Sequence, residues 1–357
     1  MNSKKKVFIT GLTGFLASHV CKILLEQGHE VKGSVRDLKS KKCDDLKKEN
    51  VFGIQGARLE IIEADITNKK GWKEALEGCH YLIHMASPVP KGDAYFKDLS
   101  VIDTAIEGTK NVLEAAVGIV ERVVLTSSSA AVIYPGGKKN DLFDFEAAPL
   151  DEDDWTKTEN SLAEIGAYSI SKTKAERWAW DFAKSKNLQL TTINPTFVIG
   201  PLLSSKIRAQ SLSMIYFASA GKINALPKQR ILIPYVDVRD VALAHVTSLT
   251  HEQAPGNRYI LHNEFYDLVD MLEELKDEFK PLSLNWPKRS VPYWKLKLAS
   301  LFKQDAKMLL SLMGPSHEKY RSINGKKVNE HFNFSYRPLK DTMRDCIQSF
   351  KDIGLIK

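Results

Sequence analysis

The first half of the chain alternates short runs of β-branched and other apolar residues with segments of helical period. These runs predict strands at residues 6–10, 31–35, 59–64, 81–85, 123–127 and 189–194. Strands that are apolar along nearly their whole length are typical of a parallel sheet that helices cover on both faces. We therefore predict an α/β fold built on a doubly wound parallel sheet.

The turn after the first predicted strand is rich in small residues. It reads GLTGFLA over residues 11–17 and leads into a helix that is expected to end at Gly28. Gly11, Gly14 and Ala17 permit a tight turn, a close approach of the backbone to a pyrophosphate, and close packing of the helix on the strand. The N–H groups at the start of the helix would then face phosphates. We predict a dinucleotide site that includes Gly11 and Gly14.

The alternation of strands and helices loosens after residue 200. Prolines recur at 201, 227, 234 and 255, and again at 281, 287 and 292 in a stretch with several Trp and Lys residues. We assign residues 1–200 to a dinucleotide-binding Rossmann domain, whose sheet is completed by about 231–262 with a return of the chain around 231–248. Residues 201–230 and about 263–357 are expected to form a smaller substrate lobe.

The tip of the second predicted strand carries an arginine. Arg36 stands where folds that bind NAD present a carboxylate to the ribose 2′-hydroxyl. A guanidinium pairs well with a 2′-phosphate, which a carboxylate would repel. The sequence therefore favours NADP(H), held by Arg36 and Lys41. Two alternatives stay open: Asp37 contacts the ribose if the register differs by one residue, and Lys41, like Lys39 and Lys42, is an ordinary solvated lysine.

A tyrosine and a lysine stand one helical turn apart, at Tyr168 and Lys172, near the start of a predicted helix. Serines follow the fifth predicted strand, at the edge where parallel sheets bind ligands. Reduction of a carbonyl needs an acid that protonates the developing alkoxide and a donor that holds the same oxygen. Tyr168 fits the acid, and Ser128 or Ser129 fits the donor. Lys172 would lower the phenol pKa from about 10 towards neutrality and, with Tyr168, contact the cofactor.

Composition and charge exclude several other classes of protein. The 51 basic and 44 acidic residues give a net charge of +7, but the lysines form short scattered clusters without interleaved aromatic residues, so we expect no nucleic-acid partner. No apolar run reaches the ~18 residues that a membrane helix needs, and the first apolar stretch is broken too early for a signal peptide. The chain is therefore expected to have no membrane partner and to act as a monomer or homodimer.

The cysteines and histidines are spaced unlike metal ligands or disulfide partners. Cys21, Cys43, Cys79 and Cys346 include no CxxC pair, which favours reduced thiols and a cytoplasmic protein. The nine histidines include no HExxH motif, so we expect no metal site.

Ordered motifs link the chain to a known family. They include TGLTGFLASHV (10–20), HMASP (84–88), VVLTSSSAAV (123–132), YSISKTKAE (168–176) and YVDVRDVALAH (235–245). Together with the segments between them, they cover most of residues 7–245. The chain resembles an extended short-chain dehydrogenase/reductase, within the branch of dihydroflavonol reductases, cinnamoyl-CoA reductases and fungal aldehyde reductases.

The resemblance implies further site residues. It places Phe15 and Leu16 at the pyrophosphate, Asp65 and Ile66 at the adenine, Ala86 beneath the cofactor and Pro195 against the nicotinamide. It also selects Ser128 as the catalytic serine, with Ser129 as the alternative.

The resemblance implies an NADPH-dependent reductase of an aldehyde or ketone. Ile133 stands where plant dihydroflavonol reductases have an asparagine, and residues 165–172 read IGAYSISK where cinnamoyl-CoA reductases have an NWYCYGK-like signature. The resemblance therefore does not imply a flavonoid or a cinnamoyl-CoA as the substrate. Two other functions share the motifs: an NAD-dependent sugar-nucleotide epimerase or dehydratase, and a non-catalytic protein that senses NADP.

Overall fold

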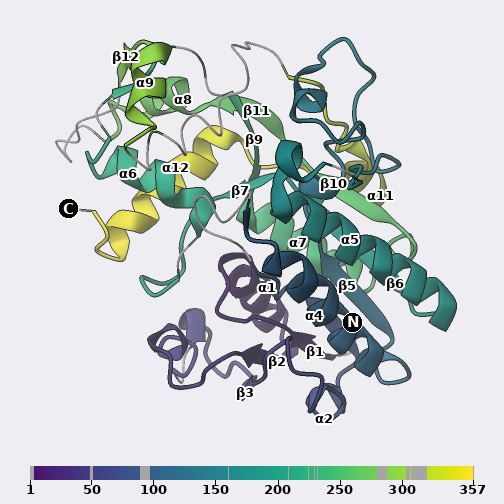
Figure 1. Ribbon diagram of the computed structural model, residues 1–357. Coiled ribbons are helices and arrows are strands. Elements are labelled where there is room, and N and C mark those ends of the chain that lie inside the picture. The colour runs from purple at the N-terminus through teal and green to yellow at the C-terminus, as the bar shows by residue number, and fades with distance from the viewer. Residues whose placement is uncertain are drawn as a thin grey trace.

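A seven-stranded parallel sheet forms the centre of the molecule in the order β10-β6-β5-β4-β1-β2-β3 (Figure 1). The computed structural model describes residues 4–48, 51–88, 97–159, 161–207, 209–223, 225–228, 230, 232–279, 288–302, 306 and 320–356. The strands are β1 (Lys6–Ile9), β2 (Glu30–Val35), β3 (Leu59–Glu63), β4 (Tyr81–His84), β5 (Arg122–Thr126), β6 (Leu190–Pro195) and β10 (Arg258–Leu261). All six predicted strands are confirmed, each end to within one residue.

Helices cover both faces of this sheet, as predicted. One face carries α1 (Phe15–Glu26), α7 (Val238–Ser248) and α11 (Lys326–Phe332), and the other carries α2 (Trp72–Leu76), α4 (Ser100–Ala116) and α5 (Leu162–Lys186). Residues of β1 alternate between the two cores: Val7 and Ile9 pack under α1 and α7, whereas Phe8 packs on Trp72. This alternation places a fully apolar strand between two helical layers.

A second lobe is built around a three-stranded sheet in the order β11-β9-β7 and lies beside the main sheet (Figure 1). Its strands are β7 (Phe197–Ile199), β9 (Leu232–Asp237) and β11 (Glu264–Asp267), and a pair is formed by β8 (Ala225–Pro227) and β12 (Lys288–Val291). Its helices are α6 (Ser213–Ser219), α8 (Leu268–Leu275), α9 (Tyr293–Ala299) and α12 (Leu339–Asp352). Short 3₁₀ helices are η1 (Lys41–Cys43), η2 (Val51–Gly53), η3 (Ser129–Ala131), η4 (Lys139–Phe143) and η5 (Gln210–Leu212).

The predicted return of the chain to the main sheet around 231–248 is made by helix α7 and not by a strand. Strand β9 pairs with β7 and β11 instead, and the seventh strand of the main sheet is β10. A short apolar run does not reveal which sheet edge it joins, and here β7, which follows β6 directly, offers β9 a parallel partner.

The C-terminal part of the chain contributes to both cores. Helix α12 packs in the second lobe, where Phe350 belongs to the core, whereas Val328 of α11 belongs to the core under α1 and α7. The lobe boundaries at 200 and about 263 therefore stay a prediction, and the parts of the predicted lobe at 280–287 and 307–319 lie outside the described residues. Within the described residues, no helix is both long and apolar enough to cross a membrane.

Helix α5 contains a break just before Tyr168. Gly166 has φ 77° and ψ 166°, a conformation that is essentially restricted to glycine. The long regular part of the helix therefore begins immediately ahead of the tyrosine.

Replacing Gly166 with alanine tests this local constraint. A Cβ at this φ and ψ should lower the free energy of unfolding by about 1–3 kcal/mol. Urea denaturation measures the change, and an unaltered m-value would show that the native and unfolded states remain comparable. A loss smaller than about 0.5 kcal/mol would mean that the break can be relieved without cost.

Candidate active site

The loop after β1 is held tightly against the ends of the neighbouring strands. Gly11 has φ 71°, and a Cβ on it would lie 3.1 Å from Cβ of Ala86. The Leu12 N–H donates to the Ser34 carbonyl at 2.9 Å, and the Gly14 N–H donates to the Gly11 carbonyl at 2.9 Å. The loop thus turns tightly at the carboxyl end of β1 and ends at the exposed Gly14, as a pyrophosphate site requires.

The N-terminus of α1 is open to an anion. No side chain caps this helix, and no acidic residue stands in its first turn. Phe15 packs in the core of the second lobe and Leu16 is half-buried, so Phe15 can serve a phosphate only through its backbone N–H. The residues present fit the predicted pyrophosphate position, because uncapped N–H groups and the helix dipole both favour negative charge.

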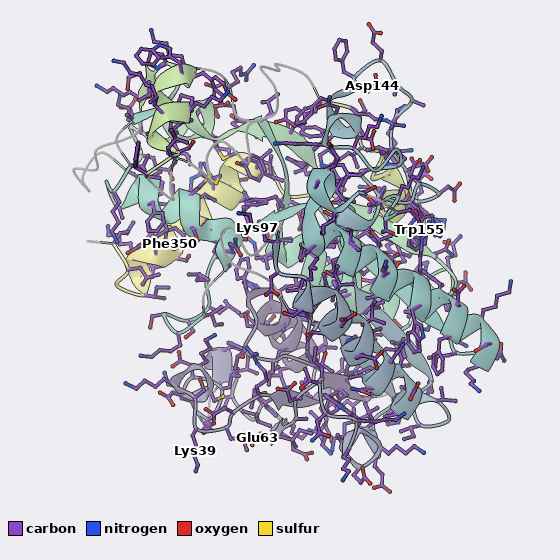
Figure 2. The ribbon with its side chains drawn as sticks, viewed as in Figure 1. Lys39, Glu63, Lys97, Asp144, Trp155 and Phe350 are labelled. Atoms are coloured by element: carbon purple, nitrogen blue, oxygen red, sulfur yellow. The ribbon has the colours of Figure 1, made fainter. Side chains whose placement is uncertain are left out.

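The tip of β2 presents a free guanidinium. Arg36 is exposed, and within the described part of the chain its guanidinium has no ion-pair partner. The Asp37 carboxylate accepts the Lys39 N–H at 2.8 Å and so closes the turn, a local role that does not need a ribose. Lys41, also exposed, begins η1. Figure 2 shows Lys39 and Glu63 at this same border of the molecule, where β2 and β3 end.

The loop after β3 is anchored to α4. Asp65 accepts the N–H and the hydroxyl of Thr67, each at 2.8 Å, and the Ile66 carbonyl accepts the Asn111 amide at 2.8 Å. A Cβ on Gly108 would lie 2.7 Å from Cδ1 of Ile66, so only a glycine at this position of α4 leaves room for the Ile66 side chain. These contacts hold the proposed adenine-side residues beside the tip of β2.

Two further predicted residues lie at the same edge of the sheet. The Ala86 N–H donates to Thr10 Oγ1 at 2.9 Å, which ties the end of β4 to the end of β1. Pro195 is buried as the last residue of β6, opposite Leu261 of β10. Both therefore lie on the side to which the phosphate loop opens.

The structure brings Ser128, Tyr168 and Lys172 together. The Ser128 hydroxyl faces the Tyr168 phenol closely enough to lower its pKa. The Lys172 ammonium, one turn further along α5, donates to the Thr126 carbonyl at 3.3 Å. Ser129 begins η3 and is buried, and its carbonyl accepts the Val132 N–H at 2.8 Å. Of the two candidate serines, Ser128 is therefore the one paired with the tyrosine.

Burial dominates the electrostatics of this trio. It raises the pKa of the Tyr168 phenol, and the facing Ser128 hydroxyl only partly opposes this. Burial also lowers the pKa of Lys172 to about 8, against the opposing charge of Glu176. The expectation that Lys172 brings the phenol towards neutrality is wrong for the protein alone, because desolvation of the phenol outweighs any stabilisation of its charged form.

Polar residues that the motif analysis passed over surround the trio. Ser127, Asn194 and Arg258 all donate to the carboxylate of Glu176, which follows Lys172 by one turn of α5. The available signal was the presence of Asn194 in a strand expected to be apolar, and of Glu176 on the face of α5 that bears Lys172. Sequence spacing alone did not show that these residues meet.

The model of the NAD dependent epimerase/dehydratase family matches residues 7–261. The chain belongs to this family. It is 36% identical to cinnamoyl-CoA reductase 1 of Petunia hybrida, over 99% of this chain and 94% of that protein. It is 31% identical to tetraketide alpha-pyrone reductase 2 of Arabidopsis thaliana, over 98% of both chains.

A solved member of the same fold extends the comparison. The structure of yeast methylglyoxal/isovaleraldehyde reductase Gre2 complexed with NADPH superposes with a TM-score of 0.77 and 26% identity, over 98% of this chain and 100% of that chain. The predicted membership of the epimerase/dehydratase family, the Rossmann-like fold, the oxidoreductase class and the use of NADP(H) are therefore confirmed.

Substitution of the two serines separates their roles. Ser128→Ala should lower NADPH-dependent turnover by about 10²-fold or more, because a hydroxyl aimed at the developing oxyanion is lost. Ser129→Ala is the matched control and should have a much smaller effect. Steady-state kinetics decides between them, and a large loss at Ser129 with little at Ser128 would reverse the assignment.

Proposed function

We propose that this protein reduces an aldehyde or ketone to the alcohol with NADPH, and that Ser128, Tyr168 and Lys172 are its catalytic residues. The observation that carries the proposal is the meeting of Ser128, at the end of β5, with Tyr168 and Lys172 on one turn of α5, where the Lys172 ammonium donates to the Thr126 carbonyl of β5 at 3.3 Å. The same edge of the sheet bears the uncapped start of α1. A polyanionic cofactor and a carbonyl substrate would meet there.

The chemistry of the three side chains follows from their burial and charge. NADPH, when bound, supplies the hydride. Tyr168, whose raised pKa keeps it protonated at neutral pH, donates its phenolic proton to the substrate oxygen as negative charge develops there. Ser128 donates a hydrogen bond to the same oxygen. Lys172, as an ammonium, favours the phenolate that remains on Tyr168, and with Tyr168 it would hold the cofactor.

The substrate class is a carbonyl compound of moderately apolar character. The relatives are named for a cinnamoyl-CoA, a tetraketide alpha-pyrone, methylglyoxal and isovaleraldehyde, so the family branch admits carbonyl compounds of different size. Ile133, half-buried, packs with Phe265 against the small core of Val132, Leu150 and Ile260. An apolar side chain at this position supports a substrate without a polar group there.

The compartment and the assembly are part of the proposal. All four cysteines are buried and free, which supports a reducing compartment such as the cytoplasm. We expect a monomer or homodimer without a nucleic-acid or membrane partner.

The test of the proposed function is turnover of a panel of aldehydes, diketones, aromatic ketones and hydroxysteroids, followed by NADPH absorbance. Tyr168→Phe, which removes one hydroxyl, should lower turnover by roughly 10²–10⁴-fold while NADPH affinity survives. A variant with near-normal kcat would remove Tyr168 from the mechanism. Turnover of a UDP-sugar with none of the carbonyl compounds reduced would favour the epimerase or dehydratase instead.

The cofactor preference is tested at Arg36. A charge-assisted bond between the guanidinium and the 2′-phosphate predicts that NADPH exceeds NADH by ~10 to ~150-fold in kcat/KM. Arg36→Ala should remove most of this preference by weakening NADPH and leave NADH turnover nearly unchanged. Lys41→Ala measures the contribution of the neighbouring lysine. A wild-type preference for NADH would instead make Asp37 the ribose ligand.

A further inference from the structure

Glu176 is a buried carboxylate at which several parts of the fold meet. Its side chain has no exposed surface, and it lies one turn after Lys172 on α5. Its donors are Ser127 Oγ at 2.5 Å, Asn194 Nδ2 and Arg258 Nε at 2.8 Å each, Thr192 Oγ1 at 3.0 Å and Trp180 Nε1 at 3.3 Å. A buried charge with this many donors is well solvated by the protein.

The donors connect Glu176 to the catalytic serine. Ser127 immediately precedes Ser128, and the Asn194 amide that donates to Glu176 also donates to the Ser128 carbonyl at 3.2 Å. The backbone on both sides of Ser128 Cα is thus tied to this carboxylate. A small cavity beside it is lined by Lys172, Ser127, Glu176 and His84, so the lysine and the carboxylate border the same cavity.

Arg258 fixes the far side of the carboxylate. Its guanidinium lies 3.6 Å from the ring centre of Trp155, which is labelled in Figure 2, and donates to the carbonyls of Glu152 and Asp154 at 2.6 and 2.7 Å. The arginine is thereby held by groups that do not belong to the reductase site. A buried ion pair of this kind is weak evidence for stability alone, since apolar residues of similar volume often stabilise a fold as well.

The groups that face Lys172 leave Glu176 as its counter-charge. Tyr168 on the same helix is neutral, and burial together with the charge of Lys172 lowers the pKa of His84 on β4 to about 3, so this histidine is neutral too. The Thr126 carbonyl on β5 does not titrate. Among the described residues, Glu176 is the charge that opposes the effect of burial on the pKa of Lys172.

We propose that Glu176 is a positioning residue of the reductase site, which fixes the Ser127–Ser128 end of β5 and holds Lys172 as an ammonium in its buried surroundings. This inference rests on the proposed function, because it assigns Glu176 a role in that reaction. Two separable effects follow: the carboxylate's hydrogen bonds set the position of Ser128, and its charge sets the protonation of Lys172.

The experiment is the pH profile of kcat/KM for the carbonyl substrate in the wild type, Glu176→Gln and Glu176→Asp. Activity should fall above about pH 8 in the wild type as Lys172 loses its proton. Without the carboxylate, the pKa of Lys172 falls further, and the falling limb should move to lower pH by about one unit in Glu176→Gln. Glu176→Asp keeps the charge on a shorter side chain, so its limb should stay near that of the wild type while kcat falls.

A matched control is available on the other face of the sheet. Asp240 of α7 is also a buried carboxylate paired with an arginine, Arg337, and accepts the Arg337 N–H at 2.8 Å. Asp240→Asn should lower the free energy of unfolding without shifting the pH at which kcat/KM falls. If Glu176→Gln leaves Arg258 unpaired and fails to fold, the double variant Glu176→Gln/Arg258→Gln removes both charges, and the limb must still move to lower pH.

Ser127→Ala tests the positional effect without a change of charge. It should lower kcat by about tenfold with the limb in place, because Ser128 loses one of its anchors. The role of Glu176 would be overturned if its variants and Ser127→Ala bind NADPH, keep the wild-type kcat and lose activity at the same pH as the wild type. A wild type that reduces no carbonyl compound would instead overturn the proposed function, so the two failures are distinct.

Discussion

Because all seven strands of the main sheet run parallel, their carboxyl ends meet at one edge, and every residue proposed for chemistry is placed by that constraint. The order of the strands reverses next to β1, between β1 and β4. There the buried Thr10 hydroxyl accepts the N–H groups of Met85 and Ala86, each at 2.9 Å, and lies 2.9 Å from Nδ1 of His84. This short cluster holds the two strand ends together where the phosphate loop leaves the sheet.

The second determinant of the site is the burial of its ionisable side chains. Tyr168 and Lys172 lie in a region where burial opposes the charged form of each, so the phenol stays protonated and the ammonium needs a counter-charge. Glu176 provides that charge, and it is itself held by Arg258, which stacks on Trp155. The loop that carries Trp155 is thus connected to Lys172 through the buried side chains of Arg258 and Glu176. Burial of the phenol thus keeps the acid protonated before a substrate arrives.

Much of this could be predicted from the sequence, and the rest could not for physical reasons. Periodicity located six strands because each is a short run rich in apolar and β-branched residues. Local spacing made Gly11, Gly14, Tyr168 and Lys172 candidates, since one turn or one helix decides their relation. The sheet that β9 joins could not be predicted, because strand pairing is a long-range choice. The cluster around Glu176 joins positions 127, 176, 194 and 258, which only the folded sheet brings together.

The central claim is that hydride passes from NADPH to a carbonyl carbon in the site formed by Ser128, Tyr168 and Lys172. Turnover with NADPH deuterated at C4 of the nicotinamide, on the face that transfers hydride, tests this most directly, with mass spectrometry and NMR of the product alcohol. The account predicts one deuterium on the carbinol carbon for each NADPH consumed. NADPH oxidation that leaves no deuterium in the product, or conversion of a substrate with no net consumption of NADPH, would contradict it.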